Sequence, residues 1–104
     1  MIQFKLKYSD EAKTQFLELE TTKSKYKQYK AVAKTLGLMQ TNLRHPSLHT
    51  HKFDEIFSAT GGEVFESYAE NKTPGAYRVF WCYGPKRGCL YIIAITPHPY
   101  DPLG

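Results

Sequence analysis

The sequence lacks a long hydrophobic run and a secretory signal. No stretch reaches the roughly 20 apolar residues that a membrane-spanning helix needs, and the first residues, MIQFKLKYSDEAK, become charged at once. We therefore expect a cytoplasmic protein with no membrane partner. The 2 cysteines, Cys82 and Cys89, are too few for a disulfide framework, so free thiols are expected. The sequence also has no internal repeat, low-complexity tract or linker.

The apolar side chains that are present suffice for one small core. Of the 104 residues, 41% are hydrophobic and 14% aromatic, which argues against a disordered chain and predicts a single domain over 1–104. The formal net charge is +4. A mildly basic domain is compatible with a nucleic acid or with an acidic protein as partner, and the charge alone does not distinguish the two.

The first part of the chain has the pattern of a strand followed by two helices. Residues 2–8 alternate apolar and polar side chains, which predicts a half-buried strand. Ser9 is a typical N-cap for a helix over 10–21, and a second helix is expected over 25–40. The apolar positions at helical spacing are Ala12, Phe16, Leu17 and Leu19 in the first helix and Tyr26, Tyr29, Ala33, Leu36 and Met39 in the second. The short polar break between the helices predicts an antiparallel helical hairpin with lysines along its outer side.

The rest of the chain has the pattern of strands. Pro46 disfavours helical geometry at His45, so the second helix must have ended before it. Strands are expected over 51–56, 63–69, 76–83 and 89–96. The segment YGPKRG predicts a tight hairpin between the last two strands, and either register is possible, so Cys82 and Cys89 could lie opposite or diagonal to each other. The order β-α-α-β-β-β-β predicts an α+β domain, with the helical hairpin on one face of a mainly antiparallel sheet and the apolar last strand at its centre.

Arg78 is the unusual residue of these strands. Alternation in AYRVFWCY puts it on the face opposite Trp81, and a charge among aromatic residues in mid-strand is costly to bury unless it is paired. Glu66 on a neighbouring strand is the candidate partner. Alternation along the last strand would put His98 on the face opposite Arg78, although Pro97 ends the regular strand before that point.

Three of the 4 histidines lie in the segment NLRHPSLHTHKF. Histidines spaced like His45 and His49 bind a metal well on a helix, but Pro46 lies between them and prevents one. His51 follows on a predicted strand, and no cysteine or carboxylate cluster is near enough in sequence to complete four ligands. We therefore expect no metal and no cofactor, and we interpret His45 and His49 as mainly structural.

Five pieces of the sequence resemble one family when taken in order. They are the first strand with its lysine-rich helical hairpin, NLRHPSLHTHKF, VFESYA, AYRVFW and CLYIIAITPH, and they cover nearly the whole chain. In this order they resemble the RelE/ParE superfamily of toxins from bacterial type II toxin–antitoxin systems. The resemblance implies a RelE/ParE-like fold and an acidic antitoxin protein as partner.

The resemblance to RelE implies a metal-independent endoribonuclease, an mRNA interferase that cleaves ribosome-bound mRNA. Arg78 lies where such members keep an arginine that contacts the phosphate, and a guanidinium can bind phosphate bidentately without losing its charge. His98 lies where several members keep a histidine acting as acid or base. Glu66 could be a base, as carboxylates are in some members, or only the partner of Arg78, which is the role we favour. The implied substrate-binding residues are Lys52, Arg44 and Tyr100.

Other interpretations remain open. Members similar to ParE inhibit DNA gyrase instead, and a protein that keeps the fold could bind an antitoxin without any activity. His98, bracketed by Pro97 and Pro99, could simply cap a rigid turn, and Lys52 could be a solvated edge lysine. The sequence also has no lysine or arginine after Arg87, whereas the ribonuclease members concentrate basic residues near the C-terminus.

Overall fold

The computed structural model covers residues 1–104 and describes residues 3–54 and 62–99. Its elements follow the predicted order β-α-α-β-β-β-β, with two short 3-10 turns. The strands are β1 (Lys5–Tyr8), β2 (His51–Lys52), β3 (Phe65–Tyr68), β4 (Tyr77–Tyr83) and β5 (Cys89–Pro97). The helices are α1 (Asp10–Thr21) and α2 (Tyr26–Thr41), and the 3-10 turns are η1 (Lys23–Lys25) and η2 (Pro46–Leu48).

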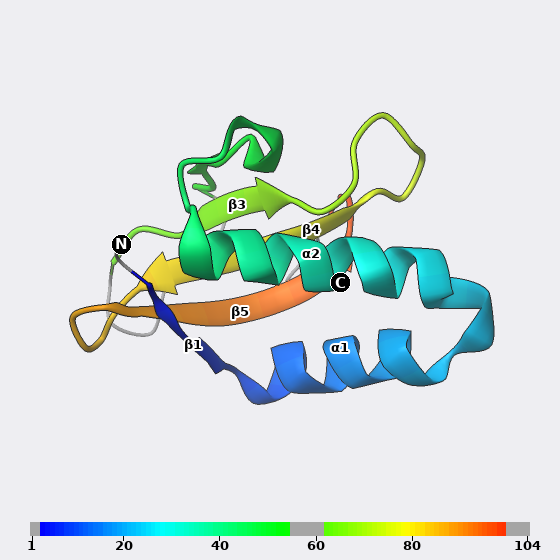
Figure 1. The fold of residues 1–104 in the computed structure, drawn as a ribbon, viewed down its shortest axis with the longest axis horizontal. Coiled ribbons are helices and arrows are strands. Elements are labelled where there is room, and N and C mark those ends of the chain that lie inside the picture. Colours follow the sequence, from blue (N-terminus) through cyan, green and yellow to red (C-terminus); the bar gives the residue numbers. More distant parts are fainter. Residues whose placement is uncertain (1–2, 55–61, 100–104) are drawn as a thin grey trace.

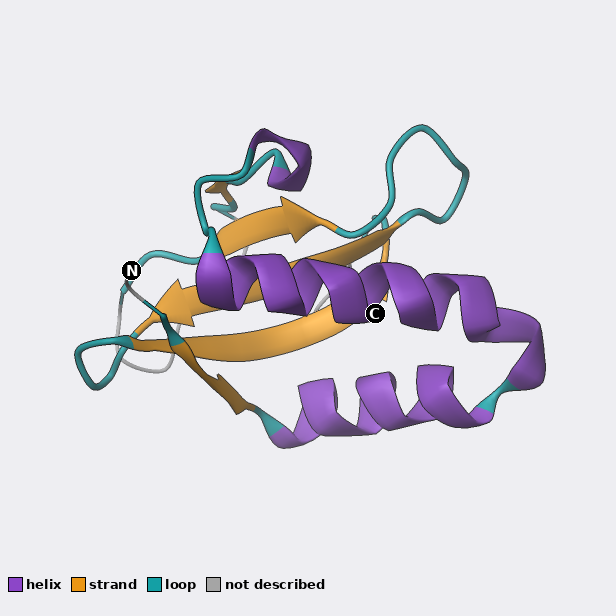
Figure 2. Cartoon of the chain, in the orientation of Figure 1, coloured by secondary structure: helices purple, strands orange, loops and turns teal. Residues whose placement is uncertain are grey.

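The fold has two layers, a helical hairpin and a 5-stranded sheet (Figure 1). The strand order is β1-β5-β4-β3-β2, with β1 parallel to β5 and the other pairings antiparallel. Both helices lie on the same face of the sheet, α1 against β5 and α2 against β4 (Figure 2). The predicted α+β class and the helical hairpin are therefore confirmed, and β5 is an inner strand between β1 and β4, whereas β4 is the middle strand of the sheet. Within the described ranges, no helix is long and apolar enough to cross a membrane.

Helix α1 begins where its cap was predicted. The Ser9 hydroxyl oxygen accepts a hydrogen bond of 2.9 Å from the backbone N–H of Ala12 and donates one of 2.6 Å to the carbonyl of Ile93. Asp10 and Glu11 occupy the first turn, where negative charge is favourable at the positive end of the helix dipole. The predicted range 10–21 is confirmed, and its cap also ties α1 to β5.

The main core lies between the helices and the sheet. Its sheet residues are Tyr77, Val79, Trp81, Leu90, Ile92 and Ile95. A smaller cluster on the other face of the sheet consists of Val64, Phe80 and Ala94, with Phe53 and Ile93 packed against it. The predicted division of β4 into two faces is therefore confirmed.

The buried side of the helices differs in part from the predicted stripes. In α2 the buried residues are Val32, Thr35, Leu36 and Met39. Tyr26, at the start of α2, is 62% exposed, and Leu17 of α1 is also exposed. Leu17 lies on the outer side of α1, since Leu19, two residues nearer the connected end of the helices, is buried in the core.

Strand β5 contains one irregularity. Trp81 of β4 pairs with Ile92, whereas the preceding residue, Phe80, pairs with Ala94. Ile93 is therefore an extra residue between two positions of the ladder, which is the arrangement of a β-bulge. A bulge of this kind reverses the alternation of every residue that follows it.

The bulge determines the side of the sheet on which His98 lies. Ile92, before the bulge, and Ile95, after it, both pack in the main core against the helices. Thr96 then pairs with Arg78, on the face away from the helices. Alternation without a bulge would have put His98 opposite Arg78, and with the bulge the two residues lie on the same side of the sheet.

The strands are shorter than predicted at several ends. The strand predicted over 2–8 begins at Lys5, because the N–H of Phe4 donates to the carbonyl of Gln40 at 2.9 Å instead of joining the sheet. The strand predicted over 51–56 has ladder pairs only at 51–52, and residues 55–61 lie outside the described part of the chain.

The β4–β5 hairpin settles the relation of the two cysteines. Cys82 pairs with Tyr91, so Cys89 lies diagonal to it, and both thiols are free and buried. Gly88 in the turn has a φ of 81°, a conformation that favours glycine.

Candidate functional site

Glu66 is a buried acidic residue on the face of the sheet away from the helices. It lies in β3, pairs in the ladder with Phe80 of the smaller core cluster, and is only 4% exposed. A carboxylate at such depth is unfavourable without charged or hydrogen-bonding partners. Its partners within 4.0 Å are His51, Arg78 and His98.

His51 of β2 contacts Glu66 directly. Its Nε2 lies 2.7 Å from Glu66 Oε1, and its Nδ1 lies 2.8 Å from the carbonyl oxygen of His49. A carbonyl oxygen can only accept, so His51 Nδ1 donates to the His49 carbonyl, and one proton is shared between His51 Nε2 and Glu66 Oε1. The His49 carbonyl therefore holds the Nδ1 proton in place.

Arg78 of β4 lies against the second oxygen of the same carboxylate. Its Nε is 3.5 Å from Glu66 Oε2, and its Nη1 donates to the carbonyl of Glu70. The predicted pairing of Arg78 with Glu66 is confirmed. The pair is too long for a hydrogen bond, and both Arg78 Nε and Glu66 Oε2 are buried without one. Such unmet charged groups are rare in packed interiors, so this pair is a candidate for function.

His98 reaches the cluster from the end of β5. Its backbone N–H donates to the carbonyl of Ala76 at 2.8 Å, and its Nδ1 lies 3.7 Å from Glu66 Oε2. The side chains of His51 and His98 are 46% and 54% exposed, whereas that of Glu66 is almost wholly covered. The buried carboxylate therefore lies between two histidines that solvent can reach.

The ring of Tyr68 completes the arrangement. It lies in β3, with Arg78 Cζ 3.6 Å from its centroid, which is the geometry of a cation–π contact. The rings of His49 and His51 lie 5.0 Å and 5.8 Å from it. Tyr68 thus restrains Arg78 and His51 in their positions. We call the five residues His51, Glu66, Tyr68, Arg78 and His98 the Glu66 cluster.

The Glu66 cluster combines a permanent cation, a carboxylate and two accessible imidazoles. Imidazoles can take up and release protons near neutral pH, and a guanidinium favours an anionic ligand. Among the residues that the structure describes, no group of three or more His, Cys, Asp or Glu side chains is arranged to hold a metal ion.

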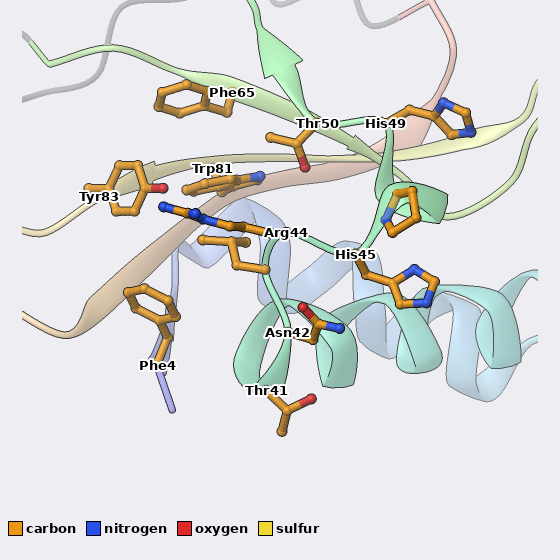
Figure 3. Close-up of a pocket in the computed structure, with 12 residues that line it drawn as sticks. Phe4, Thr41, Asn42, Arg44, His45, His49, Thr50, Phe65, Trp81 and Tyr83 are labelled. Carbon is orange, nitrogen blue, oxygen red and sulfur yellow. The ribbon is translucent and has the colours of Figure 1, made fainter. Parts of the chain in front are cut away.

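The predicted substrate-binding residues are not part of this cluster. Lys52 Nζ forms an exposed ion pair of 2.8 Å with Glu63 Oε1, and the hydrogen bond and charge of Glu63 raise the pKa of Lys52 above its ordinary value. Tyr100 lies outside the described residues. Arg44 lies in a separate groove of about 760 Å³ on the helix-covered side of the sheet (Figure 3).

His45 and His49, the other two histidines of the segment NLRHPSLHTHKF, have local structural roles. The Nδ1 of His45 accepts a hydrogen bond of 3.1 Å from the backbone N–H of Ser47 and so caps η2. His49 has a φ of 46°, in the left-handed region, directly after η2. The interpretation of both residues as mainly structural agrees with these contacts, and the carbonyl of His49 additionally fixes His51.

Sequence reasoning missed two residues of the cluster, Tyr68 and His51, of which His51 is the one that can transfer a proton. The signal was present, since His51 is the first residue of a predicted strand and Glu66 lies in the next one. Only the register of the β2–β3 pair places the two side by side, and the sequence does not specify that register.

Comparisons with known proteins find likeness in structure and none in sequence. Neither a protein-family model nor a curated protein sequence matches the chain. A chain of the archaeal RelE–RelB complex from Pyrococcus horikoshii OT3 matches with a TM-score of 0.62 and 10% identity, covering 96% of this chain and 100% of that one. The YoeB dimer from Staphylococcus aureus matches with a TM-score of 0.61 and 13% identity, covering 92% of this chain and 98% of that one.

These matches extend over nearly the whole of each chain, and identities this low establish a shared fold rather than a shared activity. The two layers, the helical hairpin and the mainly antiparallel sheet are those expected from the resemblance to the RelE/ParE superfamily. The protein therefore has the RelE-type fold that is also found in YoeB.

Proposed function

We propose that the protein is the toxin of a type II toxin–antitoxin system and a RelE-like, metal-independent endoribonuclease. The observation that carries this proposal is the Glu66 cluster. A buried Glu66–Arg78 pair underlies two accessible histidines, His51 and His98. The RelE-type fold supports the proposal because the fold is shared with the RelE–RelB complex and YoeB.

The proposed reaction is an internal transesterification of RNA. His98, whose Nε2 has no hydrogen bond among the described residues, removes the proton from the 2′-hydroxyl, and O2′ then attacks the adjacent phosphorus. The bond between phosphorus and O5′ breaks. O5′ takes up a proton from His51, whose ring first leaves Glu66 Oε1, because its Nε2 lies 2.7 Å from that buried oxygen in the free protein. The products are a 2′,3′-cyclic phosphate and a 5′-hydroxyl.

Arg78 and Glu66 have supporting roles in this proposal. The guanidinium supplies a fixed positive charge beneath the phosphate, whose negative charge grows in the transition state. Glu66 holds the Nε2 proton of His51 and orients both imidazoles, so that it acts as a positioning residue rather than as the base.

The proposed partners are an acidic antitoxin and ribosome-bound mRNA, and the proposed location is the cytoplasm. The similarity to a chain of the RelE–RelB complex supports a protein partner, and the net charge of +4 favours an acidic one. The ParE-like alternative, inhibition of DNA gyrase, is retained as an outcome of the experiment below.

Induced expression in a bacterial host tests the proposal. We expect growth arrest and new 5′ ends in cellular messages, detected by primer extension, with both lost in Arg78→Ala and His98→Gln. His98 is exposed, so its variant should fold even where loss of the buried Arg78 harms stability. Lys27→Gln, an exposed change on α2, should leave cleavage unchanged.

Two other results would contradict the ribonuclease proposal. Growth arrest with intact messages and gyrase trapped on DNA would identify a gyrase inhibitor. A soluble, folded protein that causes no arrest would identify a toxin fold that binds an antitoxin without activity.

A further inference from the structure

The groove that holds Arg44 lies between the end of α2, the segment that follows it, and the sheet. Its lining residues are Phe4, Thr41, Asn42, Leu43, Arg44, His45, Pro46, His49, Thr50, Phe65, Trp81 and Tyr83. In Figure 3 the side chain of Arg44 points across the groove in the direction of Tyr83, while His45 and His49 lie at the other end. A second hollow adjoins the groove at Phe4 and Tyr83 and is lined by the β4–β5 hairpin.

The charges around this groove have one sign. Arg44 is exposed, and no ion pair or hydrogen bond engages its guanidinium in the described part of the chain. Lys86 and Arg87 line the adjoining hollow, and none of the described residues that line either hollow is an Asp or Glu. The surface therefore favours an anionic ligand, and a free guanidinium suits a carboxylate or a phosphate bidentately.

The walls of the groove are largely apolar. Leu43 and Pro46 come from the segment after α2, and Phe65 and Trp81 come from the sheet, with ring centroids 4.9 Å apart. Tyr83 is 55% exposed although its ring packs on Phe65 and Trp81. A large exposed aromatic side chain at the mouth of an apolar groove indicates a binding surface.

We propose that this groove docks a segment of an acidic protein, with an apolar side chain between the walls and a carboxylate on Arg44. A nucleic acid strand fits less well, because sequence-independent binding needs a row of cations along the groove, whereas the described lining of the groove holds one permanent cation, Arg44, and Lys86 and Arg87 lie in the adjoining hollow. A peptide needs only one apolar anchor and a nearby carboxylate. The proposal rests on the proposed toxin function, for which it locates the antitoxin contact.

The groove and the Glu66 cluster lie on different sides of the sheet. Trp81, in the groove wall, faces the helices, whereas Glu66 pairs with Phe80 on the other face. Peptide binding at the groove can therefore be measured without RNA and without any cleavage. Failure of the docking proposal would not be mistaken for failure of the ribonuclease proposal, or the reverse.

Trp81 provides the measurement, since it is the 1 tryptophan of the sequence and, although itself buried, contacts the rings of Phe65 and Tyr83 that line the groove. The probe is a synthetic peptide of about twelve residues that carries glutamates around one phenylalanine and one leucine. We expect saturable quenching or shift of the Trp81 fluorescence of the full chain. A peptide of the same length with lysine in place of each glutamate should give no change.

Variants locate the binding. Arg44→Glu should weaken peptide binding at least about tenfold, because it replaces a charge-assisted pair with a repulsive one. Lys27→Glu makes the same change of charge on the exposed side of α2 and should alter binding less than about twofold. Circular dichroism of both variants checks that the fold is kept.

Three results would overturn the proposal. The first is equal weakening by Arg44→Glu and Lys27→Glu, which would mean attraction to overall charge. The second is equal binding of the acidic and basic peptides. The third is displacement of the acidic peptide by a single-stranded oligouridylate at a lower concentration than unlabelled peptide requires, which would assign the groove to nucleic acid.

Discussion

At the scale of single residues, Glu66 connects the stability of the fold to the candidate site. Its carboxylate is the one anionic partner that Arg78 has within 4.0 Å in the described residues, and both side chains are buried. Removal of one member of a buried pair leaves the other charge without compensation. The pair of Lys52 and Glu63 is also an ion pair with a glutamate, but it is exposed, so it serves as the control for the buried pair.

We expect Glu66→Ala to lower the free energy of unfolding by about 3 kcal/mol, because it leaves the Arg78 guanidinium buried without an anion. Glu63→Ala should lower it by less than about 1 kcal/mol, since solvent screens an exposed pair. Urea denaturation followed by circular dichroism measures both values. Equal losses in the two variants would show that the Glu66–Arg78 pair has no special part in the fold.

Cys82 allows a prediction about thiol chemistry. Burial raises the pKa of the Cys82 thiol above its ordinary value, so less thiolate is present at any given pH below that pKa. In Cys89→Ser, which leaves Cys82 as the single thiol, alkylation by iodoacetamide should require a higher pH than alkylation of a cysteine peptide. Mass spectrometry measures the rate. A profile that coincides with that of the peptide would contradict the effect of burial.

Side-chain contacts could be predicted where the chemistry of the two residues alone determined the partner. A mid-strand arginine needs a carboxylate, and Glu66 was the available one, so the Arg78–Glu66 pair could be predicted. His51 could not, because its place beside Glu66 depends on the register of β2 and β3. The sequence could not show that Lys52 pairs with Glu63, which depends on the same strands. It also could not show that Arg44 lies in a different groove, because that depends on how the segment after α2 packs.

At the scale of elements, two glycines should respond in opposite ways to alanine. Gly37 lies in α2 with nothing within 4 Å of an added Cβ, whereas Gly88 has a φ of 81° in the β4–β5 turn. Gly37→Ala should stabilise the protein by up to about 1 kcal/mol through helix propensity. Gly88→Ala should destabilise it by about 1 kcal/mol, since alanine is strained at positive φ.

Thermal unfolding of the two variants beside the parent measures these changes. A rise in the midpoint for Gly37→Ala and a fall for Gly88→Ala are expected. If Gly88→Ala raised the midpoint, the turn would have to adopt another conformation than the one described.

The helices and strands could be predicted better than the irregularities within them. The cap at Ser9 and the range of α1 followed from local chemistry and are confirmed. The bulge at Ile93 could not be recognised in the sequence, because it lies in an apolar run whose residues suit either face of the sheet. The bulge determines that His98 and Arg78 lie on the same side. An alternation rule cannot detect such a residue, because the rule assumes that none exists.

At the scale of the whole molecule, the sheet separates two surfaces with different chemistry. The side away from the helices carries the Glu66 cluster, and the helix-covered side carries the groove with Arg44. Under the proposed function, the first surface would take the RNA and the second would take the antitoxin. This division gives Arg44, Lys86 and Arg87, which lie outside the Glu66 cluster, a proposed role in binding the antitoxin.

The end groups of RNA fragments test the central claim most directly. The purified protein is incubated with ribosomes carrying a defined mRNA in the presence of EDTA, and the fragments are analysed by mass spectrometry. We expect 2′,3′-cyclic phosphate and 5′-hydroxyl ends, lost by at least about a hundredfold in rate in His98→Gln and His51→Gln and kept in Lys27→Gln. Intact mRNA, or cleavage that survives both histidine changes, would contradict the assignment of ribonuclease activity to the Glu66 cluster.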